Sequence, residues 1–353
     1  MVQSHNEIHH LKFPFKNIIS FFIITVFFSK CRDAYKFQSI QSETHLVVNG
    51  SINSGPAPYY LTLGNTSLPD QIPTPIENAL ITISDNRGNS ETYMPGGKGQ
   101  YILKGSNVRG VPGLRYRLSI TLQNARTYHS TQELMPVSPP TSDTTFFKIT
   151  QEDVISSEGV TITNTFCNVY LDTDFPQDSS RYFRWGVEEV YLIIPLSNTR
   201  LCYIFKPKSE SNFVLVKTSD YSSPHLNNLL LQRSVVDFTY SWAHFFNVTS
   251  YCMNESNYQY WTKVKGLIDR QGSVFDTPPA KVPGNITSDI DDKELVFGYF
   301  EATTIGKVVR VRVNKESIPD RALIPCYKFP FFQYCDNCDY LPGSTKDQPP
   351  WWY

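Results

Sequence analysis

The chain has 353 residues, enough for one large or two ordinary domains. Hydrophobic residues make up 40% of it and aromatic residues 14%, so packed cores are expected and wholesale disorder is excluded. Charged residues account for only 18% and the formal net charge is -1, which argues against a nucleic-acid-binding protein, because such proteins normally carry a basic patch. The 23 Phe and 21 Tyr residues favour β structure.

The first thirty residues have the pattern of a secretory signal. Lys12 and Lys16 precede an apolar run over residues 18–28, and Cys31 follows closely. The run is shorter than the ~20 apolar residues needed to span a bilayer. A cysteine at this place indicates a lipoprotein signal, in which Cys31 is lipidated and becomes the mature N-terminus, although Lys30 stands where such signals have a small residue. An ordinary secretory signal cut nearby and an uncleaved anchor are the alternatives.

The N-terminal half of the exported chain is predicted to form a β-sandwich. After a polar tether over residues 31–43, apolar residues alternate with period two and are interrupted by turns at ~10-residue spacing over residues 44–134. This pattern is similar to immunoglobulin-like or transthyretin-like modules. The expected strands lie at residues 46–48, 59–63, 79–84, 99–103, 115–120 and 127–130. The Pro-rich residues 135–142 cannot form a central strand and are expected to be a linker.

A second antiparallel sandwich is predicted over residues 143–324, so the fold class is all-β with one helix. The helix is expected at residues 255–270, where an apolar stripe recurs at helical spacing and should be buried against this sandwich: Tyr258, Trp261, Val264, Leu267 and Ile268. The strands are expected at residues 145–150, 159–171, 182–195, 213–217, 295–302 and 307–313. Residues 325–353 are aromatic and cysteine-rich and are expected to form a disulfide-stapled tail.

Six cysteines follow Cys31, and an even number suits disulfide pairing in an exported chain: Cys167, Cys202, Cys252, Cys326, Cys335 and Cys338. The C-x-x-C at 335–338 also admits a redox or a zinc site. However, no βαβ unit precedes it, and no matching histidine follows. The last three thiols lie within thirteen residues, so at least one of them needs an outside partner if all are oxidised.

Motifs that mark catalytic chemistry are missing from the sequence, which contains no G-x-S-x-G, H-E-x-x-H, Walker loop or dinucleotide fingerprint. Glu188 and Glu189 are adjacent, but on a strand they would point to opposite faces and could not act as a pair. Four histidines are expected to be surface or core residues rather than ligands: His45, His129, His225 and His244. One acidic cluster indicates a solvated hairpin, with a calcium loop as the alternative: Asp289, Asp291, Asp292 and Glu294. No catalytic, cofactor-binding or metal-binding residue is therefore predicted.

The aromatic residues that close the chain are candidate ligand contacts. Trp351, Trp352 and Tyr353 could stack on a sugar or peptide, because aromatic faces bury area without a charge partner. The alternative is that the tail packs these rings on the second sandwich.

A set of short motifs occurs in a fixed order along the chain. They are Val48-Asn49-Gly50, Tyr182-Phe183-Arg184-Trp185, Cys202-Tyr203, Tyr260-Trp261, residues 272–280, Gly284-Asn285-Ile286, Gly298-Tyr299-Phe300 and the Cys-x-x-Cys tail that ends in Pro350-Trp351-Trp352. The set resembles the domain of unknown function family 4249, exported lipoproteins of Bacteroidota, over nearly the whole mature chain. The resemblance implies an outer-membrane lipoprotein without an assigned reaction, often encoded beside TonB-dependent transporters.

The resemblance also guides the expected pairing of the cysteines. Because Cys202-Tyr203 and the tail cysteines both belong to the pattern, Cys202 is expected to pair with a tail cysteine. One local tail bridge and a bond between Cys167 and Cys252 would remain.

The function expected from the sequence is non-enzymatic and needs no cofactor. The protein would be a lipid-anchored accessory or ligand-capture subunit of a TonB-dependent transporter at the outer membrane. A hydrolase with a loop-assembled site and a structural or adhesive surface protein are the alternatives. A deep polar cleft with convergent carboxylates would favour the hydrolase, and a shallow aromatic surface would favour binding.

Overall fold

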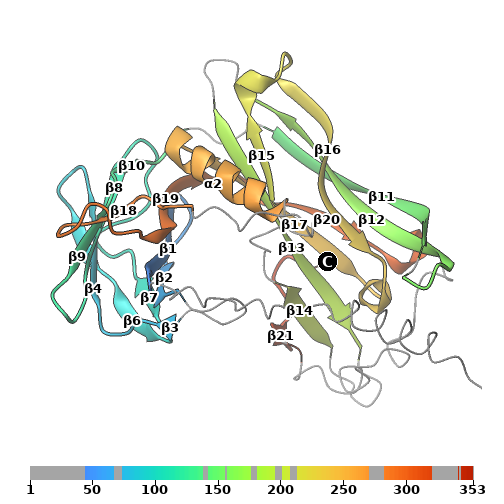
Figure 1. Ribbon diagram of the computed structural model, residues 1–353. Coiled ribbons are helices and arrows are strands. Elements are labelled where there is room, and N and C mark those ends of the chain that lie inside the picture. Colours follow the sequence, from blue (N-terminus) through green and yellow to red (C-terminus); the bar gives the residue numbers. More distant parts are fainter. Residues whose placement is uncertain are drawn as a thin grey trace, which may run out of the picture. The chain divides into compact units, whose positions relative to one another are not determined.

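The computed structural model describes residues 44–352 apart from 67–73, 138–141, 156, 176–180, 195–200, 207–212, 270–281, 320–340 and 342. The expected signal, the tether, the middle of the linker and most of the tail lie outside these residues. Strands dominate the described chain, which has one α-helix and three short 3-10 helices (Figure 1). The 3-10 helices are Thr218–Asp220, Phe238–Tyr240 and Lys315–Ser317. The all-β fold class with one helix is therefore confirmed.

The first sandwich has a strand at each of the six expected places. One layer contains β1 (Leu46–Asn53), β2 (Tyr59–Asn65), β3 (Thr74–Pro75), β6 (Met94–Gly97) and β7 (Gln100–Leu103). The other contains β4 (Leu80–Asp85), β5 (Ser90–Thr92), β8 (Arg115–Thr121), β9 (Thr127–Ser130) and β10 (Glu133–Leu134). Alternate side chains of both layers form one core, in which Val48, Leu61, Ile81 and Leu118 are fully buried. The period-two pattern therefore predicts both the positions of the strands and the face of each strand that points into the core.

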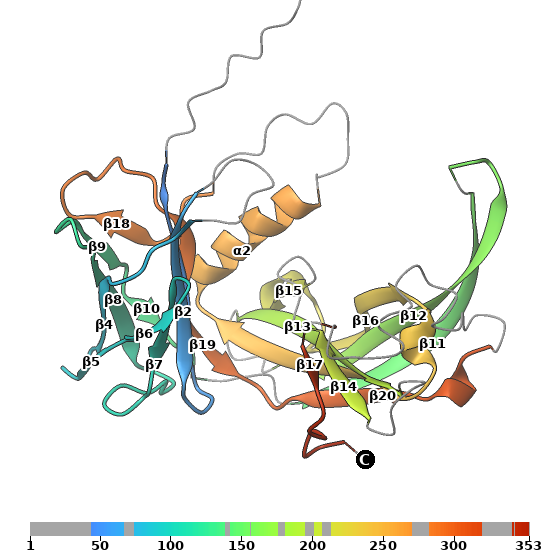
Figure 2. The same cartoon turned by 90° about the horizontal axis from the view of Figure 1, so that it is seen from below.

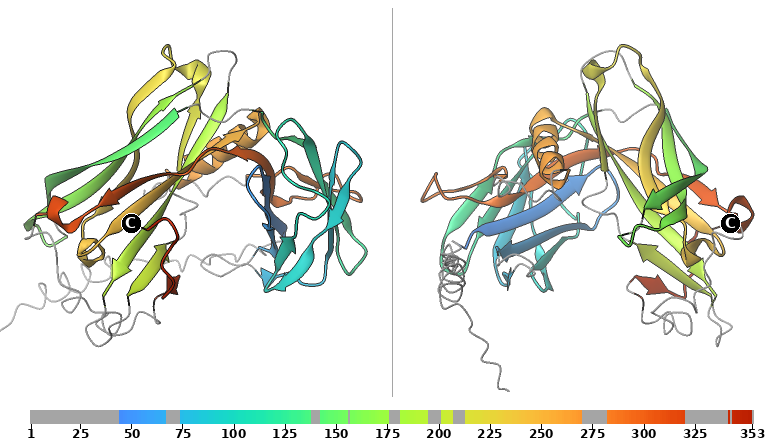
Figure 3. Two further views of the ribbon diagram at one scale, coloured as in Figure 1. Left: turned by 180° about the vertical axis from the view of Figure 1, so that it is seen from behind. Right: turned by 45° about the vertical axis from the view of Figure 1, so that its right-hand side comes forward.

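Two strands from much later in the chain complete this sandwich. β18 (Ile286–Ser288) pairs antiparallel with β9, and β19 (Phe297–Ile305) pairs in parallel with β1 (Figure 3). Three of the residues they bring, Ile286, Phe300 and Ala302, join the first core. The expected range 44–134 therefore contains only part of the first sandwich. Period-two patterning marks β19 as a strand but carries no information about the strand with which it pairs.

The second core lies between two further groups of strands. A three-stranded sheet contains β11 (Ser142–Ile155), β12 (Thr161–Asp174) and β16 (His225–Val235). The facing strands are β13 (Tyr182–Ile193), β14 (Cys202–Lys206), β15 (Phe213–Lys217), β17 (His244–Met253), β20 (Val309–Val313) and β21 (Ser344–Thr345). Val169, Trp185 and Phe246 are fully buried between them. The sequence did not predict β17, because nine of its ten residues are buried and no alternation of apolar and polar residues remains.

One continuous sheet links the two cores. β17 pairs with β19 through Tyr251↔Ile305 and Cys252↔Thr304, and the order runs β21-β14-β13-β17-β19-β1-β2-β7-β6 (Figure 2). β19 consequently borders β17 at one end and β1 along the rest of its length. Residues between the two cores are therefore positioned by shared backbone hydrogen bonds.

The helix α2 (Glu255–Ile268) follows β17 directly, and its predicted position is confirmed. Asn254 caps it, because the Asn254 side chain accepts a hydrogen bond from the backbone N–H of Asn257 at 2.9 Å. The helix contacts β13, β15 and β19. Its apolar stripe is only half-buried, whereas the polar Asn257 is fully buried. The stripe is therefore less buried than expected. Its exposed part borders a groove.

Candidate functional site

The groove lies between α2 and the outer face of β1, β2 and β19, and it has a volume of about 570 Å³. Side chains of β1 alternate, so the residues opposite to the core-facing Val48 point outward, and Asn49 and Ser51 line the groove. The helix contributes Tyr260, Trp261, Val264 and Ile268 to the other wall. A volume of this size suits a small ligand.

Aromatic rings form much of the groove wall. The rings of Tyr260 and Tyr299 lie 4.7 Å apart, and those of Tyr260 and Trp261 lie 5.6 Å apart in an edge-to-face arrangement. Trp261 also packs edge-to-face on Phe213 of β15 at 5.1 Å. Across the groove, Tyr60 of β2 is 49% exposed, so its ring is open to solvent and to a ligand. Such rings offer flat apolar area with polar atoms at the edge.

A polar network holds the wall rings in place. Arg184 of β13 contacts Glu301 of β19 through Nη2, at 3.3 Å from Oε1 and 3.1 Å from Oε2. The Arg184 guanidinium carbon lies 4.1 Å from the Trp261 ring centroid, a cation–π geometry. The Nδ2 amide of Asn257 donates to Glu301 Oε2 at 3.1 Å. The Glu301 carboxylate is therefore satisfied from two sides, and Trp261 is oriented by a fixed cation.

The groove floor needs glycine at Gly298, where β19 approaches β1. Gly298 has φ +82°, and a Cβ there would lie 2.1 Å from the Val48 carbonyl oxygen. Asn285 fastens the same strand, because its Nδ2 donates to the Phe300 carbonyl and its Oδ1 accepts from the Phe300 N–H, both at 2.9 Å. Gly298 and Asn285 therefore fix the positions of β1 and β19 beneath the groove.

A second network fixes the start of α2. Glu133 of β10 is buried, and its Oε1 accepts from Thr131 Oγ1 at 2.6 Å and from Asn285 Nδ2 at 2.9 Å. Glu133 Oε2 accepts from Nδ2 of the helix cap Asn254 at 2.6 Å. The cap residue therefore ties the helix to the first sandwich through a carboxylate.

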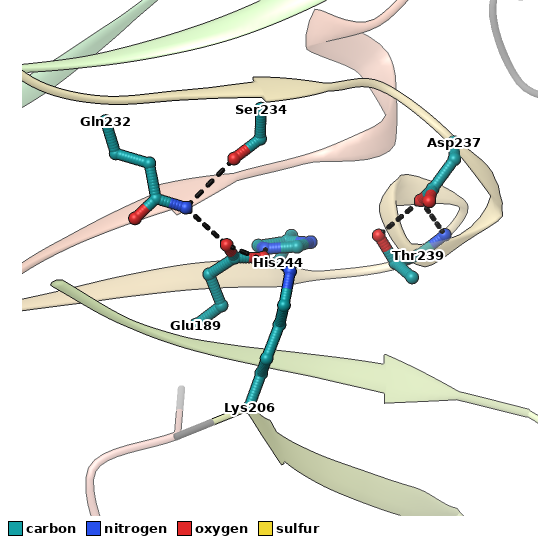
Figure 4. A network of polar contacts seen from close by, with 7 residues as sticks. All are labelled: Glu189, Lys206, Gln232, Ser234, Asp237, Thr239 and His244. Carbon is teal, nitrogen blue, oxygen red and sulfur yellow. Dashed lines mark hydrogen bonds and ion pairs between the residues drawn. The ribbon is translucent and has the colours of Figure 1, made fainter. Parts of the chain in front are cut away.

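A second pocket, of about 560 Å³, lies in the second sandwich around Glu189 of β13 (Figure 4). Glu189 Oε2 lies 3.3 Å from Nε2 of His244, and the Glu189 carboxylate also accepts from Nε2 of Gln232. Lys206 Nζ lies 3.4 Å from both carboxylate oxygens. Burial alone would raise the pKa of Glu189, but the neighbouring His244 ring, the charge of Lys206 and the Gln232 hydrogen bond together lower it below its usual range.

Aromatic stacking holds the histidine of this pocket. The fully buried His244 ring lies 4.1 Å from the Tyr240 ring and 5.5 Å from the Tyr191 ring, nearly parallel to both. From the sequence, His244 is expected to be a surface or core residue, and the structure places it in the core. Glu188 and Glu189 do face opposite ways: Glu188 accepts from Asn247 at 2.9 Å, while Glu189 lines the pocket. Their expected separation is confirmed.

The aromatic tail residues, predicted as candidate ligand contacts, pack on the protein. Trp352 is 8% exposed, and its ring lies 4.5 Å from Phe245 and 5.0 Å from Tyr203. Trp351 is half-buried beneath the Arg310 guanidinium, 4.6 Å from the ring centroid. Packing on the second sandwich, the alternative interpretation, therefore describes Trp352, whereas Trp351 is half-buried and its role as a ligand contact stays a prediction. Tyr353 lies outside the described residues.

The expected bond between Cys167 and Cys252 is wrong, because both are free, buried thiols. Cys167 lies on β12 and Cys252 on β17, and both belong to the second core. Burial raises the pKa of each thiol to about 12.

The other cysteines are only partly within the described residues. Cys202 is disulfide-bonded, and its partner lies outside them, so a bond to the tail stays a prediction. Cys31, Cys326, Cys335 and Cys338 also lie outside, and the structure does not test the lipidation or the local bridge.

The acidic cluster contacts the first sandwich. Asp289 lies 2.9 Å from His129 Nε2, and Glu294 accepts from the Tyr128 hydroxyl at 3.0 Å and lies 3.4 Å from Arg126. Within the described part of the chain, no group of three or more His, Cys, Asp or Glu side chains is arranged to hold a metal ion. The cluster therefore joins β9 to the segment after β18, and the calcium alternative gains no support.

The motifs quoted for the family resemblance converge on the groove. Asn49 and Gly50, Arg184, Tyr260 and Trp261, and Gly298 and Tyr299 come from four separate motifs and either line the groove or orient a lining ring. The sequence alone does not mark them as site residues, because only the β1–β19 pairing and the position of α2 bring them together. The signal that the sequence does offer for this site is that all of these residues belong to the motifs that resemble the family.

Comparison with known proteins agrees with the family resemblance of these motifs. The model of a family described as Domain of unknown function (DUF4249) matches residues 32–308 of the chain. No curated protein matches the chain. Among the described residues, no helix has the length and apolar character needed to cross a membrane.

Proposed function

This chain belongs to the DUF4249 family, and from that premise we propose that it is a lipid-anchored, ligand-capture protein of the outer membrane that serves a TonB-dependent transporter. The bound molecule would occupy the groove beside α2. The observation that carries the proposal is the convergence of aromatic residues from three separate segments, β2, α2 and β19, on one solvent-open groove. Trp261, Tyr260 and Tyr60 would contact a ligand with a flat apolar face, and Asn49 and Ser51 would hydrogen-bond its edge.

The chemistry of the groove supports binding rather than hydrolysis. Its buried carboxylate, Glu301, is engaged by Arg184 and Asn257 and lies in the wall. A two-carboxylate hydrolytic site needs one carboxylic acid and one carboxylate flanking the reacting bond.

The anchor would keep the groove near the membrane surface. A lipidated Cys31 would be separated from the described body by only the polar segment 32–43. A single acyl chain binds only marginally, so the proposal requires a di- or triacylated cysteine.

Anchoring is tested by the change Cys31→Ser. The variant should move from the membrane fraction to the soluble fraction, because its acylation site is lost. Mass spectrometry of the wild-type mature N-terminus supplies the direct measurement, and an unmodified residue there would remove the lipid anchor from the proposal.

Ligand capture is tested by tryptophan fluorescence against a panel of disaccharides and dipeptides. A ligand in the groove should change the emission of the wild type and should have little effect on Trp261→Phe. The matched control is Trp242→Phe, because Trp242 is 49% exposed and does not line the groove; this variant should respond like the wild type. An equal response from all three proteins would place binding elsewhere.

The transporter partnership needs a separate measurement. The full-length, membrane-anchored protein should co-purify with a TonB-dependent transporter when it is isolated from outer membranes in mild detergent. If it is recovered consistently without one, the accessory role fails, while capture in the groove is judged by the fluorescence result.

A further inference from the structure

The pocket around Glu189 combines carboxylates with aromatic walls, at a place separate from the α2 groove. Glu189 and Asp237 provide the two carboxylates, and Tyr191, Phe238 and Tyr240 provide the aromatic part of the lining. Glu189 is 8% exposed, so its charge sits in a largely desolvated place, where electrostatic attraction is stronger than in bulk water. This composition favours a cation that carries an apolar body.

Two carboxylates and two basic side chains line the pocket, and one of the two basic side chains is engaged elsewhere. Arg233 also lines it, but its Nη2 pairs with Glu152 at the surface, and its guanidinium carbon lies 3.8 Å from the Phe166 ring centroid. Two lining carboxylates, Glu189 and Asp237, therefore face the single remaining lining cation, Lys206. His244 backs Glu189 from the buried side and does not line the pocket.

Lys206 occupies the place that a ligand ammonium would take. Its Nζ lies 3.4 Å from both oxygens of Glu189, longer than the 2.7–2.9 Å typical of charge-assisted N–H···O bonds. The Lys206 side chain is 62% exposed, whereas that of Glu189 is 10% exposed. The lysine thus reaches in from solvent and makes loose contacts, so another ammonium group can replace it at small cost.

Asp237 is the second carboxylate in the lining of the pocket. Its Oδ1 accepts from the Thr239 N–H at 2.9 Å and from Thr239 Oγ1 at 2.6 Å, which fixes the carboxylate at the start of the helix Phe238–Tyr240 (Figure 4). Its Oδ2 accepts no hydrogen bond from the described residues. Asp237 therefore adds negative charge to the pocket, while Glu189 is the direct acceptor for the ammonium group.

We propose that this pocket binds a small primary amine, with the ammonium group displacing Lys206 from Glu189 and the apolar part of the amine lying against Phe238 and Val235, the accessible apolar residues of the lining. Gln232 and His244 keep the Glu189 carboxylate oriented while the cation exchanges, because both contact it independently of Lys206. The site does not depend on the function proposed for the groove.

The test is calorimetric titration of the purified, folded protein with phenethylamine and with phenethyl alcohol, which has the same ring and chain but no charge. The amine should bind at least about tenfold more tightly, as expected for a hydrogen-bonded charge contact. Glu189→Gln should lower the amine affinity by about tenfold or more. Lys206→Met should raise it about two- to fivefold, because the competing cation is removed.

Three results would overturn the proposal. Equal binding of the amine and the alcohol would mean that the pocket recognises only the apolar body. Loss of binding in Lys206→Met would mean that the lysine is itself the contact, as for an anionic ligand. Unchanged amine affinity in each of the single variants Lys206→Met and Asp237→Asn would mean that the amine neither competes with Lys206 nor senses the charge of Asp237, and these two variants serve if Glu189→Gln fails to fold.

Discussion

The α2 groove and the Glu189 pocket each contain a buried carboxylate beside a basic side chain, but the two pairs are built differently. In the groove, Arg184 and Glu301 are both largely buried, with side chains 14% and 11% exposed, and the guanidinium stacks on Trp261. In the pocket, Lys206 is 62% exposed and contacts Glu189 at 3.4 Å. A planar, stacked guanidinium is part of the wall, whereas an exposed ammonium can be exchanged. The same charge pairing therefore stabilises one site and leaves the other open to a ligand.

The largest expected effect comes from removing the cation of the groove. Arg184→Met leaves Glu301 as a buried carboxylate without its ion-pair partner, so we expect the free energy of unfolding to fall by about 3–5 kcal/mol in urea denaturation. The double variant Arg184→Met with Glu301→Gln should recover part of this loss, because the uncompensated charge is then removed. A loss below about 1 kcal/mol in the single variant would contradict the structural role of the pair.

A smaller loss is expected for the ring that the guanidinium covers. Trp261→Ala should lower the free energy of unfolding by about 2 kcal/mol, less than the 3–5 kcal/mol of a fully buried aromatic, because Trp261 is only half-buried. Trp242→Ala is the matched control, and at 49% exposure it should stay within about 0.5 kcal/mol of the wild type. Similar losses in the two variants would mean that α2 does not depend on Trp261 for its packing.

Glu189 should make the free energy of unfolding depend on pH under acidic conditions. The pKa of Glu189 is lower in the folded than in the unfolded protein, so its ionised form stabilises the fold above the ordinary glutamate range, and this contribution disappears as the pH falls through the folded value. Unfolding measured from pH 7 downward should show a weaker acid dependence for Glu189→Gln than for the wild type. Parallel pH profiles would contradict the lowered pKa.

The smallest effect is expected for the exposed cation of that pocket. Lys206→Met should change the free energy of unfolding by less than about 1 kcal/mol, because an ion pair with so exposed a lysine is screened by solvent. Urea denaturation side by side with Arg184→Met measures the contrast between the two pairs directly. Comparable losses in both variants would remove the distinction between a wall cation and an exchangeable one.

Local sequence pattern predicted the elements well where one face is buried and the other is solvated. The strands of the first sandwich and α2 follow from period-two and helical spacing, since apolar residues such as Val48 and Leu61 alternate with polar ones. Three strands of the second sandwich, β14, β16 and β17, escaped prediction, and in β17 nine of the ten residues are buried with no alternation of apolar and polar residues. The sites escaped for a different reason: Arg184 meets Glu301, and Glu189 meets His244, only through strand pairings between distant segments. No local pattern marks such pairs, although the alternation correctly separated Glu188 from Glu189.

The parallel pairing of β1 with β19 has a consequence for the order in which the protein can be assembled. The first sandwich receives Phe300 and Ala302 only from a segment synthesised some 250 residues after β1, at about 5–20 residues per second. Until that segment arrives, β1 has an unpaired edge and the core beneath it is incomplete. The N-terminal strands therefore cannot close early as an independent folding unit. Contacts of such long sequence separation also slow folding, so the newly made chain passes through a stage in which an edge-protecting chaperone would be useful.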